Sequence, residues 1–219
     1  MSWRELIVRY ARERGRLGGF VLLAVIMAAV GRWTGGPVER WTGNGSAFEL
    51  AVGTLAALVF MLAFRIWDDL EDRPRDARDH PTRVTVVADS PKPLAALAIG
   101  LAVVGMSLVV IGPRALGRLA ALVAAAMLLG AWYRWRGTRT SAVVNGHVVL
   151  LKYPLIAFAA TASPSFAALA SLYLALCIYE VVDDPALRAS IVARRIAISE
   201  CAIVSAIVVT AALLGGRTP

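Results

Sequence analysis

Long apolar stretches constrain the fold of this chain more than any other feature of its sequence. Spanning the roughly 30 Å hydrocarbon core of a bilayer takes about 20 largely apolar helical residues. Seven stretches approach or meet this length: 17–33, 46–67, 93–112, 115–133, 142–161, 164–182 and 196–214. Because little sequence remains between them, we expect a single all-α domain over residues 1–219, folded as a polytopic transmembrane helical bundle of about seven spans.

The first apolar stretch could also be a cleaved secretory signal. Residues 1–16 precede it, however, and carry five arginines. This segment is longer than the brief basic start of a signal peptide. The sequence Gly31-Arg32-Trp33 that follows is a poor cleavage site. We therefore expect this stretch to be retained as the first helix.

Positive charge is distributed unevenly among the segments that connect the spans. Seventeen of the 23 Lys and Arg residues lie in segments 1–16, 65–92, 133–141 and 180–195, whereas the alternate segments hold five. This is the positive-inside pattern, which predicts a bacterial inner-membrane protein with its N-terminus in the cytoplasm. The net charge of +8 is thereby explained by topology and by contact with the lipid bilayer, and a nucleic-acid partner is not expected.

Nine of the fifteen Asp and Glu residues fall in two short windows, each just after an apolar span on the expected cytoplasmic side. The first window holds Asp68, Asp69, Glu71, Asp72, Asp76 and Asp79, and the second holds Glu180, Asp183 and Asp184. Asp68, Asp72 and Asp76 are four residues apart, so they share one face if the second span continues as a helix. Clustered carboxylates of this kind suit Mg²⁺ bound together with substrate phosphates. The alternative is a solvated face on which neighbouring arginines pair with the acids.

The first acidic window resembles the first signature of the UbiA superfamily of intramembrane prenyltransferases. That signature reads N-D-x-x-D-x-x-x-D, followed by a P-x-R element. Here Asp69, Asp72 and Asp76 match the three aspartates, Asp68 replaces the leading Asn, and a Pro81-Thr82-Arg83 sequence matches the trailing element. The resemblance implies the all-α fold of that family, although typical members have about nine spans and this sequence predicts seven.

Two further segments resemble elements of the same family less closely. Residues 133–145 are similar to the element that ends the fourth span, with Arg139 in place of a common Lys and Asn145 at the position of a common Asn. Residues 179–184 occupy the position of the second aspartate motif but begin it with Glu180 instead of Asp. The order of these elements agrees with the family along nearly the whole chain.

The resemblance implies a Mg²⁺-dependent enzyme that ionises a polyprenyl diphosphate and transfers the prenyl group to a small aromatic or lipophilic acceptor. In this interpretation Arg83 and Arg139 contact diphosphate oxygens. Tyr133, Tyr153 and Tyr179 line the chamber, although tyrosines are also common at membrane interfaces. The implied metal ligands are Asp69, Asp72, Asp76, Glu180, Asp183 and Asp184, and the implied substrate contacts include Asp68 and Asn145.

Lys152 and the histidines carry separate signals. Lys152 lies in the middle of a span, where an ionisable residue normally faces the bundle interior, so it could reach the diphosphate or pair with a structural carboxylate. His80 and His147 are isolated in the sequence, so we do not expect a zinc site.

Two other functions remain open, namely a membrane terpene cyclase of the same superfamily that needs no acceptor, and a non-catalytic cation-binding membrane protein.

Overall fold

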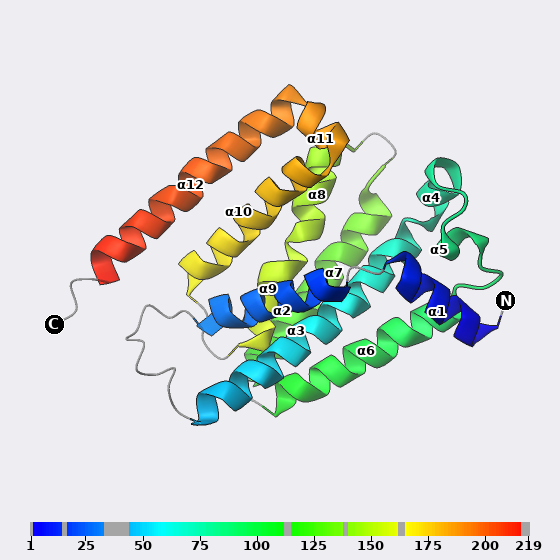
Figure 1. Ribbon diagram of the computed structural model, residues 1–219, viewed down its shortest axis with the longest axis horizontal. Coiled ribbons are helices and arrows are strands. Elements are labelled where there is room, and N and C mark those ends of the chain that lie inside the picture. Colours follow the sequence, from blue (N-terminus) through cyan, green and yellow to red (C-terminus); the bar gives the residue numbers. More distant parts are fainter. Residues whose placement is uncertain are drawn as a thin grey trace.

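The chain folds as a bundle of helices in the computed structural model (Figure 1). The structure describes residues 2–14, 17–32, 44–111, 115–137, 140–161 and 165–215, and within these ranges it contains helices and no strand. The helices are α1 (Trp3–Glu13), α2 (Leu17–Arg32), α3 (Asn44–Glu71), α4 (Arg73–Asp79), α5 (Val84–Val87), α6 (Lys92–Val110), α7 (Ala115–Trp135), α8 (Ala142–Leu150), α9 (Lys152–Ala160), α10 (Phe166–Asp183), α11 (Pro185–Ala189) and α12 (Ile191–Gly215). The expectation of an all-α membrane protein is thus confirmed.

Five segments among the described residues are long and apolar enough to cross a membrane. They are Ala47–Glu71 in α3, Lys92–Val110, Ala115–Trp135, Ala142–Ala160 and Phe166–Asp183. Helices also occupy the other two expected positions, but the apolar part of α2 covers only Gly18–Val30, and α12 carries Arg194, Arg195 and Glu200 near its start. The structure therefore supports five of the seven expected spans by length and composition.

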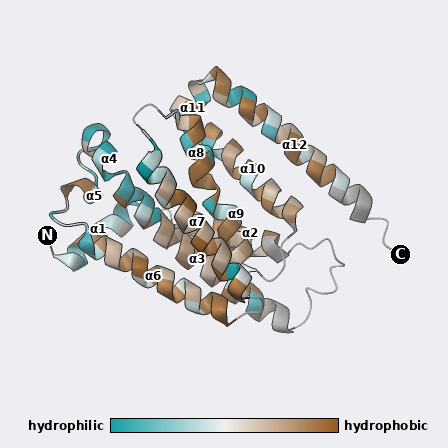
Figure 2. Ribbon diagram, turned by 180° about the vertical axis from the view of Figure 1, so that it is seen from behind, coloured by the Kyte–Doolittle hydropathy of each residue, from teal (hydrophilic) through white to brown (hydrophobic). Residues whose placement is uncertain are grey.

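Polar residues gather at one end of the bundle, which we call the polar end. The short helices α4, α5 and α11 lie there together with α1, and hydrophilic residues are concentrated in this region (Figure 2). The long helices carry exposed apolar side chains instead, for example Ile99 on α6 and Met127 on α7. Exposed apolar surface of this extent is expected where helices contact lipid.

The core of the bundle forms around α3, which packs against α2, α6 and α9. Small residues allow the close approach that holds membrane helices together. A Cβ atom at Gly53 would lie 2.8 Å from the carbonyl oxygen of Ala160, and one at Gly105 would lie 2.7 Å from the Phe60 ring. Glycine is therefore required at Gly53, where the close atom belongs to the backbone, whereas a larger residue at Gly105 would have to displace the Phe60 ring.

Helices α8 and α9 form one span with a break at Leu151. Pro154 explains the break, because proline has no N–H to donate to the carbonyl four residues earlier and its ring disturbs that turn. The break makes Lys152 the first residue of α9, close to the polar end of α3.

Candidate functional site

The first acidic window lies where α3 passes into α4. The helical backbone continues through it, because the amide of Asp72 donates to the carbonyl of Asp68 at 2.9 Å and that of Asp76 donates to the carbonyl of Asp72 at 2.8 Å. Pro74, near the start of α4, has no N–H to donate, which accounts for the short interruption at Asp72. The second expected span thus extends beyond its apolar part and carries the acids to the polar end.

Asp68 of α3 forms a buried ion pair with Lys152 of α9. Its carboxylate accepts a hydrogen bond from the Lys152 ammonium and another from the Tyr133 hydroxyl of α7. The side chains of Lys152 and Asp68 are 3% and 8% exposed. The Lys152 Nζ also lies 5.3 Å from the centre of the Tyr153 ring. The unusual mid-span lysine therefore has a carboxylate partner in the bundle interior.

Asp69 binds the N-terminal helix to the bundle. Its Oδ2 accepts a hydrogen bond from the Tyr10 hydroxyl at 2.7 Å, and its Oδ1 accepts one from Arg14 at 2.8 Å, with Arg65 at 3.4 Å. Burial, and then the negative charge of Asp69, raise the pKa of the Tyr10 phenol well above its usual value. The phenol therefore stays protonated and donates to the carboxylate. Asp69 is covered by α1, which is a contact that the acidic motif alone does not predict.

Asp72 faces the segment that follows α7. Its Oδ1 accepts a hydrogen bond from Arg136 Nη2 at 2.6 Å. Arg136 also donates to the side-chain oxygen of Asn145 at 3.2 Å, and the Trp132 indole donates to the same oxygen at 3.1 Å. The guanidinium stacks over the Tyr133 ring, 4.4 Å from its centre. The predicted Tyr133 and Asn145 are thus joined to Asp72 through one arginine.

Asp76 contacts the predicted Arg83 directly. Arg83 Nη1 donates to Asp76 Oδ1 at 2.6 Å, and Asp76 is 4% exposed. The other oxygen of Asp76, Oδ2, is buried and has no hydrogen-bond partner within the described part of the chain. Glu13 of α1 accepts a hydrogen bond from the Val84 amide at 2.8 Å, which fixes the segment that carries Arg83. A buried carboxylate oxygen without a donor is costly, so this position favours an added positive charge.

The three acids of the second window, at the end of α10, differ in their contacts. Asp184 accepts hydrogen bonds from the Ala186 and Leu187 amides and so caps α11. Asp183 is exposed. Glu180 is half-buried, and its carboxylate interacts electrostatically with Arg65 and Lys152.

Arg65 and Lys152 link the two acidic windows. Arg65 also interacts electrostatically with Asp68 and Asp69, and Lys152 is paired with Asp68. These two cations therefore interact with acids of both windows, on α3 and on α10. The polar end thus brings acids from both windows near the same positive charges, although the four aspartates from Asp68 to Asp76 each keep a protein partner of their own.

Sequence reasoning missed several basic residues of this region. Arg14 and Arg136 each contact a motif aspartate, but each is separated from it by more than 50 residues of sequence. The amphipathic pattern of α1 is the signal that could have indicated the contact of Arg14, because it shows that one face of this helix packs on the bundle. Among the predicted residues, Tyr179 is 56% exposed, and Arg139 lies outside the described residues.

Two cavities adjoin the first acidic window, and Trp67 lines one of them. One, of about 460 Å³, is polar, and the other, of about 470 Å³, is apolar. Residues of the polar cavity include Glu71, Asp72, Arg75, Arg78, Tyr133 and Arg136. Residues of the apolar cavity include Phe60, Phe64, Trp67, Ala98, Ala102 and Ala126. The Trp67 indole donates to Glu71 at 3.0 Å, and its ring meets Tyr133 edge to face at 5.8 Å, so one side chain connects both cavities.

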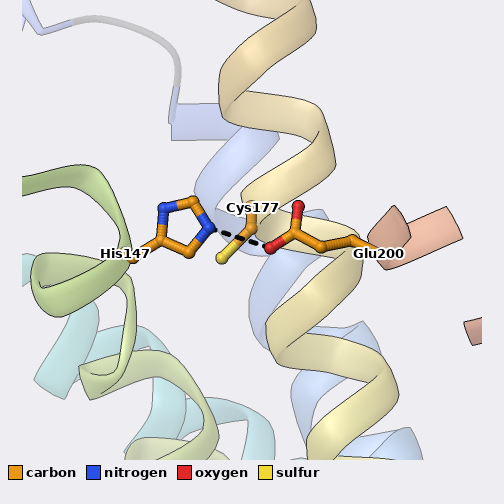
Figure 3. Close-up of side chains that lie close together, drawn as sticks. All are labelled: His147, Cys177 and Glu200. Atoms are coloured by element: carbon orange, nitrogen blue, oxygen red, sulfur yellow. Dashed lines mark hydrogen bonds and ion pairs between the residues drawn. The ribbon is translucent and has the colours of Figure 1, made fainter. Parts of the chain in front are cut away.

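A second cluster lies away from the aspartates. Within the described ranges, the metal-ligating side chains whose donor atoms gather within 4.8 Å of one another are His147, Cys177 and Glu200 (Figure 3). The sequence-based interpretation of His147 as isolated is therefore wrong. Its partners come from two other helices far along the chain, and sequence spacing does not reveal such a contact.

Comparison of the chain with protein-family models, with curated proteins and with solved structures finds no match. The site at the polar end is defined by its geometry. Its main features are an acidic helix end with basic partners, a polar cavity at that end, and an apolar cavity in the bundle beside it.

Proposed function

We propose that this chain is a Mg²⁺-dependent intramembrane prenyltransferase, with its polar end in the cytoplasm of a bacterial inner membrane. The observation that carries the proposal is the pair of cavities beside the first acidic window. Trp67 lines the apolar cavity and contacts Glu71 and Tyr133 of the polar one. One cavity is polar and charged, and the other is apolar and about as large. A polyprenyl diphosphate has the same division into an anionic head and a hydrocarbon tail. The resemblance of residues 68–83 to the first UbiA signature supports the same substrate class, and with it a UbiA-like bundle.

The apolar cavity suits a prenyl chain in its lining and in its position. Its residues Ile99 and Val123 are 66% and 55% exposed, so the cavity opens on a face of the bundle that contacts lipid. A lipid-soluble tail could enter from the bilayer there. Phe60, Phe64 and Trp67 present aromatic rings, whose negative faces stabilise a nearby cation. The allylic cation formed from the donor would lie beside these rings.

Basic side chains at the polar cavity would bind and orient the diphosphate. Arg75, Arg78 and Arg136 line it, and the forked guanidinium donors fit phosphate oxygens. Their charge favours heterolysis of the allylic C–O bond, in which the bonding electrons leave with the diphosphate. A nucleophilic carbon or oxygen of the acceptor then bonds to the prenyl carbon, and the acceptor loses a proton.

The donor set at this end fits Mg²⁺ in kind. The implied ligands Asp69, Asp72, Asp76 and Glu180 offer only oxygen, and the buried Oδ2 of Asp76 has no partner among the described residues. Asp183 and Asp184 would contribute from the second window. When bound, Mg²⁺ would neutralise charge on the departing diphosphate. The arginines that pair with these aspartates would then be released toward the substrate.

A terpene cyclase is the second candidate, because the aromatic lining of the apolar cavity could guide a cation through ring closure without any acceptor. Purified protein in nanodiscs should be incubated with geranyl, farnesyl or geranylgeranyl diphosphate, with and without Mg²⁺ and a set of aromatic acceptors. We expect Mg²⁺-dependent release of diphosphate. A cyclic product from the donor alone indicates a cyclase, whereas a product that requires the acceptor indicates transfer.

Binding should be measured in the same preparation with a non-hydrolysable prenyl thiodiphosphate. If no donor binds and none releases diphosphate, the proposal is wrong, and the non-catalytic cation-binding interpretation takes its place.

Filling the apolar cavity should change the donor preference. Ala102 lines the cavity from α6, so Ala102→Phe should reduce turnover of geranylgeranyl diphosphate by about 10-fold or more while affecting geranyl diphosphate less, as expected for the loss of about 1.4 kcal/mol or more of binding to the longer tail. Ala96→Phe on the same helix is the matched control, because Ala96 is exposed and does not line the cavity. Equal effects of the two variants on all donors would argue against a prenyl chain in this cavity.

A further inference from the structure

Three potential metal ligands meet between α8, α10 and α12, and they lie apart from the aspartates of the first window. His147 Nε2 lies 2.8 Å from Glu200 Oε1, and the Cys177 sulfur lies beside this contact (Figure 3). The donor atoms of all three lie within 4.8 Å of one another. Ligands around a tetrahedral zinc ion are about 3.4–3.7 Å apart, given its bond lengths, so small side-chain rotations would close the site.

The hydrogen bond on the far side of the imidazole prepares His147 for ligation. Its Nδ1 lies 2.7 Å from the Val143 carbonyl, which can only accept, so Nδ1 carries a hydrogen. In a neutral ring the lone pair is then on Nε2, which faces the carboxylate oxygen of Glu200. Two lone pairs at this distance require a positive charge between them, either a proton or a metal ion. Metal-binding histidines commonly donate their second ring N–H to a backbone carbonyl in this way.

Glu200 gives an independent indication that the cluster is suited to a cation. The residue is 5% exposed, and its Oε2 is buried with no hydrogen-bond partner in the described part of the chain. A carboxylate in the interior of a helical bundle is costly unless all its oxygens are satisfied. A proton shared with His147 would serve Oε1 alone, whereas a metal ion could also take Oε2.

Cys177 and Tyr173 complete the surroundings. Cys177 is 1% exposed and forms no disulfide, so its thiol is available to a metal but not to bulk solvent. Tyr173, one turn earlier on α10, donates its hydroxyl to the His147 carbonyl at 3.1 Å and meets the imidazole edge to face. These contacts hold the ring in place. The side chain of His147 is 26% exposed, which leaves a path for an ion.

We propose that His147, Cys177 and Glu200 bind one divalent transition-metal ion of the Zn²⁺ class, which fastens α12 to α8 and α10. Mixed nitrogen, sulfur and oxygen donors select Zn²⁺ and similar ions, whereas Mg²⁺ takes oxygen donors. With both carboxylate oxygens of Glu200, the three side chains would supply four donor atoms. Because α12 lies at the edge of the bundle, against α10 and α11, such a clamp would hold the last helix in place (Figure 1). The inference does not depend on the proposed prenyl transfer.

The test uses Co²⁺ as a spectroscopic probe for the zinc position. Full-length protein purified with reductant and stripped with a chelator should bind one equivalent of Co²⁺, with a thiolate-to-cobalt charge-transfer band, and Zn²⁺ should displace it while excess Mg²⁺ does not. The unmodified protein alone decides the main point, since absence of the thiolate band overturns the proposal and leaves an ordinary His–Glu ion pair.

The chain provides matched controls, because it has two cysteines and two histidines. Cys177→Ser and His147→Gln should each weaken Zn²⁺ binding by at least about 100-fold, more than the loss of an outer-shell partner. Cys201→Ser and His80→Gln replace exposed residues outside the cluster and should leave Zn²⁺ affinity unchanged. Equal losses in a matched pair would assign the metal to adventitious thiol or imidazole binding and overturn the site.

Discussion

Replacing Asp72 with Asn should reduce the release of diphosphate from a prenyl donor by at least about 100-fold, the size of loss seen when one electrostatic contact to a developing charge is removed. Asp72 lines the polar cavity and pairs with Arg136 at 2.6 Å. Asn keeps the shape of the side chain and can still accept from Arg136, so the bundle should fold. The change removes the negative charge that would hold Mg²⁺ beside the departing diphosphate. Diphosphate release at saturating Mg²⁺ measures the effect.

Asp89→Asn is the control for this variant. It makes the same chemical change at an exposed aspartate outside both acidic windows, and it should leave turnover unchanged. Circular dichroism in detergent should show the same helical content for both variants. If Asp72→Asn retains full Mg²⁺-dependent turnover, this carboxylate has no part in catalysis and the interpretation of the first window as a metal-binding motif fails.

The sequence was sufficient to predict the helices and the position of the first acidic window. Apolar stretches of sufficient length can satisfy their backbone in a membrane only as helices, so each expected span appears as a helix at nearly the expected residues. The continuation of α3 into α4 could also be predicted, because Asp68, Asp72 and Asp76 follow a helical spacing. Length and apolar composition sufficient to cross the membrane are a stricter property, and within the described residues five helical segments have them, with α2 and α12 not among these five.

The partners of the acids could not be predicted, because they depend on how distant helices pack. Arg14 reaches Asp69 only because α1 folds back against the end of α3, and Arg136 reaches Asp72 from the end of α7. The contact of His147 with Glu200 requires α8 and α12 to come together next to α10. Spacing along one helix contains none of this information. The sequence therefore indicated which residues carry charge, and the fold determined which charges meet.

The ion pair between Lys152 and Asp68 is one such contact between distant helices that can be tested. The Lys152 ammonium and the Asp68 carboxylate are both buried, and Tyr133 donates to the same carboxylate. Removing one partner of a buried pair leaves the other charge uncompensated, which is more harmful than removing both. The pair could serve the bundle, the substrate or both, and stability measurements isolate the first role.

Lys152→Met should lower the free energy of unfolding by about 3–5 kcal/mol, because it leaves the Asp68 charge buried with only a neutral hydroxyl donor. The double variant Asp68→Asn/Lys152→Met should recover most of this loss, since no isolated charge remains. Lys92, the other lysine of the chain, is exposed, so Lys92→Met should change the free energy of unfolding by less than about 0.5 kcal/mol. Denaturant titration in detergent micelles measures all three. A double variant as unstable as Lys152→Met alone would show that Lys152 does not stabilise the bundle through Asp68.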